Sequence, residues 1–377
     1  MKKLLTVLLA FFMVFALVGC SSSSDEGEDT ADDSTADEGY KIAVVTDVGQ
    51  LNDGGFNQGT YEGAVAFAEA NGYSYKYYQP ANGSDATDDD RIAAMRQAVE
   101  GGAEVIVTPG YLQATALQTV AEENPDVKFV FVDGWAMGLS NVTAISYHEE
   151  ESGFFAGYAA VKDGYTNLGG TFGGAGTNAA CNRFAYGYVQ GIQAAAARLD
   201  ETVDVTISFL YGGSFSSSTE LQTQISGWYN NGTEVVFSCG GSMLQSVKAA
   251  AAETENGKII GVDVDQASES DRVITSAVKG LSESVQIVLN EWNNGEWDSK
   301  LADQLSNLGV SDNATGIPTA EDSWRFETYT VEEYEAIKSQ VANGDIVIDS
   351  DCADLSTAEG WDSLKALCTN VNLSLEY

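Results

Sequence analysis

The chain has 377 residues, with 56 acidic side chains against 18 basic ones and a formal net charge of −38. Nucleic acids and anionic lipid surfaces require a basic binding face, so this charge makes both of them poor partners. The single histidine, His148, lies in the run YHEEE, which lacks the HExxH spacing of a metalloprotease. We expect His148 to face solvent at a junction between segments and not to act as a catalytic base.

The first 39 residues carry targeting signals. Two lysines precede an apolar run over residues 4–18, which is too short for a comfortable membrane span and is typical of a signal-peptide core. The sequence LVGC, ending at Cys20, resembles the bacterial lipobox, in which cleavage leaves a lipidated cysteine; the alternative is an ordinary signal peptide and a chance cysteine. We predict a lipoprotein signal peptide over 1–19, a disordered acidic tether over 20–39, and a lipid anchor at Cys20 on the extracytoplasmic face of the cell membrane.

Residues 40–377 are long enough for two lobes of ordinary domain size, and no later stretch approaches a membrane-spanning length. Cys181, Cys239, Cys352 and Cys368 lack CxxC spacing, so a structural zinc site is not expected. Two states are open for Cys352 and Cys368: a disulfide in an oxidising compartment, or two buried thiols. We expect neither a metal nor a cofactor.

From residue 41 the pattern alternates between strand-like and helix-like segments. Residues 41–46 (KIAVVT) form a short apolar, β-branched run, which is typical of a buried parallel strand. Residues 56–70 place Tyr61, Val65 and Ala68 at helical spacing. The series continues with expected strands at 73–78, 105–108, 129–132 and 142–145, and expected helices at 90–100 and 112–123.

A second series of similar size follows. Its expected strands are 168–172, 203–209, 235–238 and 259–262, and its expected helices are 181–197, 219–229 and 244–253. Two successive βαβ series predict an α/β fold of the two-lobed periplasmic-binding-protein kind (type I), each lobe a doubly wound, mostly parallel sheet flanked by helices. Because residues 273–292 and 324–347 are expected to cross back, the predicted lobes are 40–146 plus about 272–320, and 147–271 plus about 321–377.

Residues directly after strands face the ligand crevice of an open α/β sheet. Asp47 and Asp133 follow expected strands of the first lobe, Asp263 follows one of the second, and Gly110 and Gly241 hold comparable places. Ionised carboxylates accept hydrogen bonds from hydroxyl or amine donors, so the three Asp residues predict a cleft for a polar ligand. The alternative for each single Asp is a helix cap or a strand end.

The loop over residues 46–59 is the most distinctive one, with glycines that let the backbone approach a ligand closely. Phe56 lies where this polar loop enters a helix. Two roles are open for its ring: stacking on a flat ligand, or a hydrophobic staple that fixes the helix entry.

Motifs in a fixed order resemble those of the basic membrane protein family of lipoproteins, over nearly the whole mature chain. They are TDVG and DGGFN within 46–57, FFAGY at 154–158, FAYGYVQG at 184–191, GGSF at 212–215, VVFSCGG at 235–241, GVDVDQ at 261–266, TSAVK at 275–279 and NGDI at 343–346.

The resemblance implies a monomeric binding protein, not an enzyme, that takes up a purine nucleoside between its lobes and delivers it to an ABC permease. In that family an aromatic ring from each lobe sandwiches the base, and acidic and amide groups bind the base edge and the ribose. Carried over to this chain, Asp47 is expected to contact the base, and Phe56 and Phe237 are the expected rings.

The ribose is expected to meet Gly241, Asp263 and Lys279. The full expected ligand-binding set is Asp47, Phe56, Asn57, Gly110, Asp133, Phe237, Gly241, Asp263 and Lys279.

Departures from the family pattern concern the identity of the ligand. Val48 stands where a polar base-reading side chain can occur, and residues 242–244 differ from the usual glycine-rich stretch. The alternatives are a different small solute such as a sugar, a ligand sensor, or a nucleoside hydrolase that uses the Asp-rich first loop with a metal. Asp47 and Asp53 lack the denser carboxylate cluster that such a metal site needs, which disfavours the hydrolase.

Overall fold

The structure, a computed structural model, describes residues 40–48, 50–208, 215–352 and 354–376. The predicted signal peptide, tether and lipid-anchor residue Cys20 lie outside these ranges and stay predictions. None of the helices in these ranges combines the length and apolar character that a membrane crossing needs.

The first sheet has the order β11-β5-β4-β3-β1-β2 in the described residues, and every neighbouring pair is parallel. The apolar run of β1 is buried along its whole length, as a central parallel strand requires. The strands are β1 (Ile42–Val45), β2 (Tyr75–Tyr78), β3 (Val105–Pro109), β4 (Lys128–Val132), β5 (Val142–Tyr147) and β11 (Leu305–Leu308).

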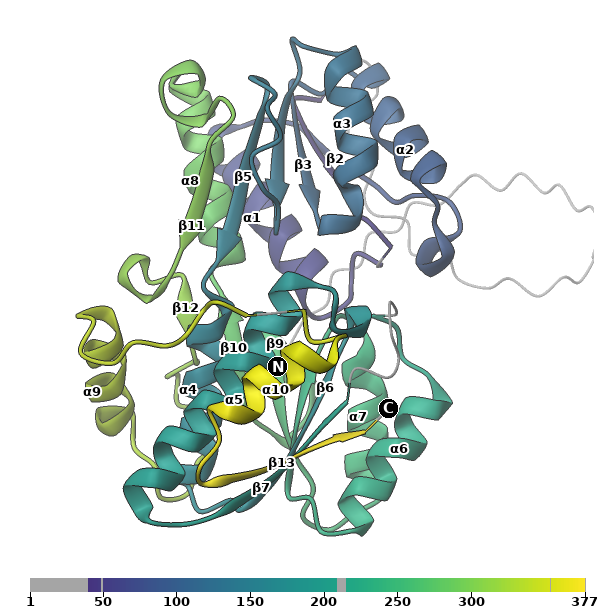
Figure 1. The fold of residues 1–377 in the computed structure, drawn as a ribbon. Helices are drawn as coiled ribbons and strands as arrows, with labels where there is room; N and C mark the ends of the chain where they lie inside the picture. Colours follow the sequence, from purple (N-terminus) through teal and green to yellow (C-terminus); the bar gives the residue numbers. More distant parts are fainter. Residues whose placement is uncertain (1–39, 49, 209–214, 353, 377) are drawn as a thin grey trace, which may run out of the picture. The chain divides into compact units, whose positions relative to one another are not determined.

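Helices cover both faces of this sheet (Figure 1). On one face, α1 (Phe56–Asn71) and α8 (Leu281–Asn293) pack with side chains of β1 and β3 into one core cluster. On the other face, α2 (Asp88–Glu100) and α3 (Ala114–Glu123) form a second cluster with the alternate residues of the same strands. This alternation is the two-residue period of a β-strand, and it makes the first lobe doubly wound.

The second sheet has the order β12-β10-β9-β8-β6-β7-β13 and is parallel except for the short antiparallel pair β10–β12, as far as the chain is described. The strands are β6 (Asn167–Phe172), β7 (Val203–Ser208), β8 (Val235–Cys239), β9 (Lys258–Asp263), β10 (Val273–Lys279), β12 (Thr315–Gly316) and β13 (Val371–Glu376).

Helices also cover both faces of the second sheet. The core on one face includes α4 (Glu149–Lys162), α5 (Ala179–Leu199), α9 (Val331–Ala342) and α10 (Ala358–Ala366), and the core on the other includes α6 (Thr219–Asn230) and α7 (Met243–Ala252). Local capping fixes several helix starts. At α2, for example, the Asp90 N–H donates to Thr87 Oγ1, while the Thr87 N–H donates to the Asp90 carboxylate.

The main chain passes between the sheets three times in the described residues, at 147–149, 279–281 and 308–315. The predicted two-lobed α/β fold is therefore confirmed. One lobe boundary differs from the prediction: β10 pairs with β9 and belongs to the second sheet, so the chain returns to the first lobe at α8 and not at about residue 272. The segment 273–292 does not reveal this change from its sequence, because only Gly280 separates a strand of one lobe from a helix of the other.

Candidate functional site

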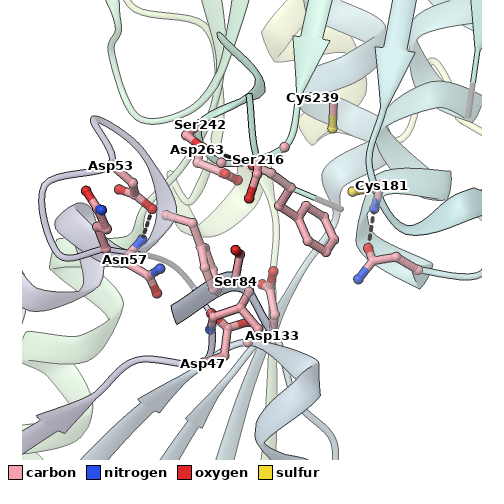
Figure 2. Close-up of a pocket in the computed structure, with 18 of the residues that line it drawn as sticks. Asp47, Asp53, Asn57, Ser84, Asp133, Cys181, Ser216, Cys239, Ser242 and Asp263 are labelled. Carbon is pink, nitrogen blue, oxygen red and sulfur yellow. Dashed lines mark hydrogen bonds between the residues drawn. The ribbon is translucent and has the colours of Figure 1, made fainter. Parts of the chain in front are cut away.

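A cavity of about 570 Å³ is lined by residues of both lobes (Figure 2). This volume lies within the range of small-molecule sites, about 300–1,000 Å³. The walls come from the carboxyl ends of strands in both sheets and from the first turns of α1 and α5, as expected for an open α/β sheet. The predicted residues that line it are Asp47, Phe56, Asn57, Gly110, Asp133, Gly241, Asp263 and Lys279.

Asp47 and Gly110 form one part of the first-lobe wall. Asp47 lies two residues after the end of β1 and is buried, and its Oδ1 accepts a hydrogen bond from the backbone N–H of Val48 at 2.6 Å. Gly110 has a φ of +98°, and a Cβ atom there would lie 2.3 Å from Asp47 Oδ2. Since no side chain fits at that distance, glycine at this position leaves the room that the Asp47 carboxylate occupies.

Asp53 holds the start of α1. Its carboxylate accepts hydrogen bonds from the backbone N–H groups of Gly55, Asn57 and Gln58 at 2.9, 3.0 and 3.1 Å. Burial raises the pKa of Asp53 to about 6, even though these hydrogen bonds favour the ionised form. The carboxylate considered for a hydrolytic metal site is thus engaged in capping a helix.

Phe56 and Asn57 begin α1 and present a ring and an amide to the cavity. The Phe56 ring packs partly against the first-lobe core, and Lys279 Nζ lies 4.7 Å from its centroid. The Phe56 ring can therefore both fix the entry of α1 and face a ligand in the cavity. Asn57 is buried, and within the described residues its Oδ1 accepts no hydrogen bond. A buried amide oxygen without a partner is costly, so a ligand donor that reached it would gain that free energy.

Lys279, at the end of β10, connects the lobes. Its Nζ lies 2.7 Å from Asp133 Oδ2 of the first lobe, 3.1 Å from Asp263 Oδ1 of the second and 3.8 Å from Glu149 Oε1. Burial alone would lower the pKa of Lys279, but the three carboxylates raise it well above its ordinary value, so the amine stays protonated. Arg183, 2.5 Å from Glu149, supplies a second cation to this buried cluster.

Asp133 and Asp263 occupy equivalent places at the ends of β4 and β9. Both have left-handed backbones, with φ of +56° and +69°. Asp is among the non-glycine residues that tolerate this region, at a cost of about 1 kcal/mol or more. Two residues with this costly backbone conformation line the same cavity, which indicates that the conformation serves to direct their carboxylates into it.

Phe237 does not line the cavity. Its side chain is fully buried in the second-lobe core, in edge-to-face contacts with Phe172, Phe184 and Tyr188. It lies inside β8, where its side chain packs under the helices, whereas cavity residues follow the strand ends. Two aromatic residues that the structure describes in the second lobe do line the cavity, Phe184 and Phe215. Phe184 is almost fully buried and packs edge-to-face on Phe237, whereas Phe215 is only half-buried, so Phe215 is the candidate for contact with a ligand.

Phe215 is half-buried and lies on the loop that precedes α6. Its ring contacts Tyr111 of the first lobe edge-to-face, with centroids 6.5 Å apart. A Cβ atom at Gly241, whose φ is +44°, would lie 2.9 Å from the Phe215 carbonyl oxygen. Gly241 therefore serves the site through its backbone, because it lets the loop that carries Phe215 lie against the end of β8.

Several cavity residues were not predicted. Tyr111 directly follows Gly110, and Asn178 caps α5 by accepting from the Cys181 N–H at 2.7 Å. The GGSF motif was a signal for Phe215, since it places an aromatic residue in a polar loop.

His148 lies at the first crossing between the sheets, and its side chain is 37% exposed, as predicted for a residue at a junction between segments, although one side of the ring is hydrogen-bonded. Its Nδ1 lies 2.9 Å from Glu150 Oε1, and its Nε2 lies 3.1 Å from Asn307 Nδ2. The hydrogen bond to Glu150 raises the pKa of His148 above its ordinary value. Across the described ranges, no three His, Cys, Asp or Glu residues are grouped as a metal site would need, and Cys352 and Cys368 form no disulfide there.

Two parallel-sheet lobes joined by three crossings, with a cavity built from the strand ends of both, define a two-lobed substrate-binding protein. The fold is shared with an ABC transporter solute-binding protein from Aeropyrum pernix K1, at a TM-score of 0.70 and 21% identity over 87% of this chain and 98% of that one.

The family described as "ABC transporter substrate-binding protein PnrA-like" matches residues 40–351, and the chain belongs to this family. The chain is 29% identical to the ABC transporter nucleoside-binding protein BmpA of Lactococcus lactis subsp. cremoris, over 81% of this chain and 90% of that protein. It is 27% identical to basic membrane protein B of Borreliella burgdorferi, over 64% and 69% of the two chains. Proteins of this family are extracytoplasmic, membrane-associated substrate-binding proteins, so a small-molecule ligand and an ABC permease are the partners of this one.

Proposed function

We propose that the protein binds a purine nucleoside between its lobes and delivers it to the permease, anchored to the membrane by lipid at Cys20. The observation that carries this proposal is the presence of an aromatic residue from each lobe, Phe56 and Phe215, at a cavity whose charged groups are carboxylates except for Lys279. The relative named as a nucleoside-binding protein supports the same ligand class.

A purine nucleoside matches this chemistry in two parts. The base has two flat faces for aromatic rings and N–H donors on its edge, which suit Asp47 and Asn57 beside Phe56. The ribose presents hydroxyl groups, which donate to carboxylates such as Asp263 and accept from the ammonium group of Lys279.

Contacts between the lobes support a ligand held by lobe closure. Lys279 is bonded to an Asp from each lobe, and Gln266 Nε2 of the second lobe donates to the carbonyl oxygen of Gly54 in the first at 2.8 Å. A ligand that contacts both walls adds its own bonds to these and favours the closed arrangement.

Equilibrium titration of the purified protein with inosine, guanosine, adenosine, ribose and glucose tests the ligand. At least one nucleoside is expected to bind with a Kd of about 1 μM or tighter, equivalent to about −8 kcal/mol, and the two sugars are expected to give no response. Binding of a sugar without any nucleoside response would overturn the proposed ligand and leave the transport role.

Two further measurements test the rest of the proposal. We propose binding without catalysis, so inosine incubated with the protein is expected to be recovered intact, and release of hypoxanthine would contradict this. A Cys20→Ala variant is expected to leave the membrane fraction of the producing cells; if it stays there at the wild-type level, the lipid anchor is rejected.

A further inference from the structure

Two thiols from separate elements meet at the wall of the ligand cavity. Cys181 lies in the first turn of α5, Cys239 is the last residue of β8, and both line the cavity (Figure 2). The two side chains are close enough to hydrogen-bond each other. Cys181 is 7% exposed and Cys239 is 1% exposed, so Cys181 is the outer member of the pair.

Two thiols in contact can be oxidised to a disulfide, and the cellular compartment of this family favours that reaction. Disulfides form and persist outside the cytoplasm, where this family acts. In a disulfide the sulfur atoms are about 2.05 Å apart, closer than two hydrogen-bonded thiols, so the bond forms by rotation of the two side chains together with a shift of the β8 end towards α5.

We propose that Cys181 and Cys239 are a reversible oxidation site in the cavity wall, and that their disulfide weakens ligand binding. The oxidant is a small-molecule disulfide, RSSR. Cys181 attacks one of its sulfur atoms, which forms a mixed disulfide and releases the first RSH. Cys239 then attacks the Cys181 sulfur and releases the second RSH. Two protein thiols and one RSSR thus give one protein disulfide and two RSH.

The order of these steps follows from burial. Burial raises the pKa of the Cys239 thiol well above its ordinary value, so this thiol stays protonated at neutral pH and is a poor first nucleophile. Cys181 is reached from the cavity first. Its place is fixed by the bond from its backbone N–H to Asn178 Oδ1.

The effect on the ligand follows from the residues next to Cys239. A Cβ atom at Gly240 would lie 3.0 Å from Phe215 Cδ1, and one at Gly241 would lie 2.9 Å from the Phe215 carbonyl oxygen. A shift of the β8 end therefore moves the surface against which Phe215 lies. This second part of the inference rests on the proposed role of Phe215 in ligand binding, whereas the oxidation itself does not.

The test is incubation of the whole protein with oxidised glutathione, followed by rapid alkylation, trypsin digestion and mass spectrometry. Arg183 and Arg198 lie between the two cysteines, so trypsin puts Cys181 and Cys239 on different peptides. A peptide pair linked through these residues is expected in the wild type and in a Cys352→Ala/Cys368→Ala control, which removes two cysteines that do not line the cavity. It is expected to be absent from Cys181→Ala, and it should disappear when a reductant is added.

The affinity for the best nucleoside, measured before and after oxidation, tests the second part. Oxidation is expected to weaken binding about tenfold in the wild type and in the control variant, with full recovery on reduction. The oxidation site is overturned if both thiols stay alkylatable in excess oxidised glutathione. The effect on binding is overturned if the linked protein keeps its affinity. A protein that binds no nucleoside still yields the linked peptides, so the oxidation site and the proposed function fail separately.

Discussion

Replacing Phe215 by alanine tests the site most directly, because it separates two aromatic residues of the second lobe. Phe215 is half-buried at the cavity, in contact with the ring of Tyr111, whereas Phe237 is fully buried in the core. Stacking of a base on an aromatic side chain is worth about 1–3 kcal/mol, so Phe215→Ala should raise the Kd for a purine nucleoside about 5- to 150-fold. Its free energy of unfolding should fall by about 1–2 kcal/mol, less than for a fully buried ring, since Phe215 is half-buried at the edge of the second-lobe core.

The matched control is Phe237→Ala. Removing this ring from its contacts with Phe172, Phe184 and Tyr188 should lower the free energy of unfolding by about 3–5 kcal/mol, while the folded fraction keeps its affinity. Titration calorimetry gives the affinity, and denaturant unfolding followed by circular dichroism gives the stability. An unchanged Kd in Phe215→Ala, or a weaker affinity confined to Phe237→Ala, would refute the assignment.

Three other changes have defined outcomes. Gly110→Ala forces a side chain into a backbone with φ of +98° and against the Asp47 carboxylate, so thermal unfolding should show a loss of about 2 kcal/mol or more, and titration a loss of affinity. Lys279→Met removes the cation that Asp133 and Asp263 share, while Glu149 keeps Arg183, and should cost about 3–5 kcal/mol near pH 7.5. Denaturant unfolding should show a smaller cost near pH 5, where those buried carboxylates with raised pKa values take up protons; equal costs at both pH values would contradict this. The pKa of Asp53 is raised to about 6 in the folded state, so its protonated form contributes stability below about pH 4 that is lost as the pH rises through about 6. Asp53→Asn should remove up to about 3 kcal/mol of this decline between pH 4 and 7, measured against the wild type by denaturant unfolding.

The two-lobed fold could be predicted because the buried parallel strands are short β-branched runs, whereas the helices that cover them place apolar residues at the 3.6-residue helical spacing. The run 273–292 was the exception. Apolar side chains on both sides of Gly280 are buried, in β10 and in α8, and hydrophobicity does not report which of two cores a residue joins. Only the pairing of β10 with β9 decides it, and that pairing is not local in the sequence.

The candidate site could be predicted for residues that follow a strand, because their position in the sequence places them at the edge of the sheet that forms the cavity. Asp47, Asp133 and Asp263 follow strand ends, and the topology of an open sheet brings such residues together. Aromatic residues were harder to assign. Phe237 lies in an apolar strand and Phe215 in a loop without periodicity, and sequence alone does not state which of them faces the cavity.

Lys279 and Glu149 of the charged cluster lie on a different kind of backbone from Phe215 and Val48. Lys279 and Glu149 lie at crossings between the sheets, whereas Phe215 and Val48 lie on loops. A change of ligand in this scaffold can therefore evolve, or be engineered, by substitutions in the loops, while the crossings keep the buried charged cluster around Lys279. The same division suits a biosensor: residues on the loops set which molecule is detected, and the crossings transmit its arrival to both lobes.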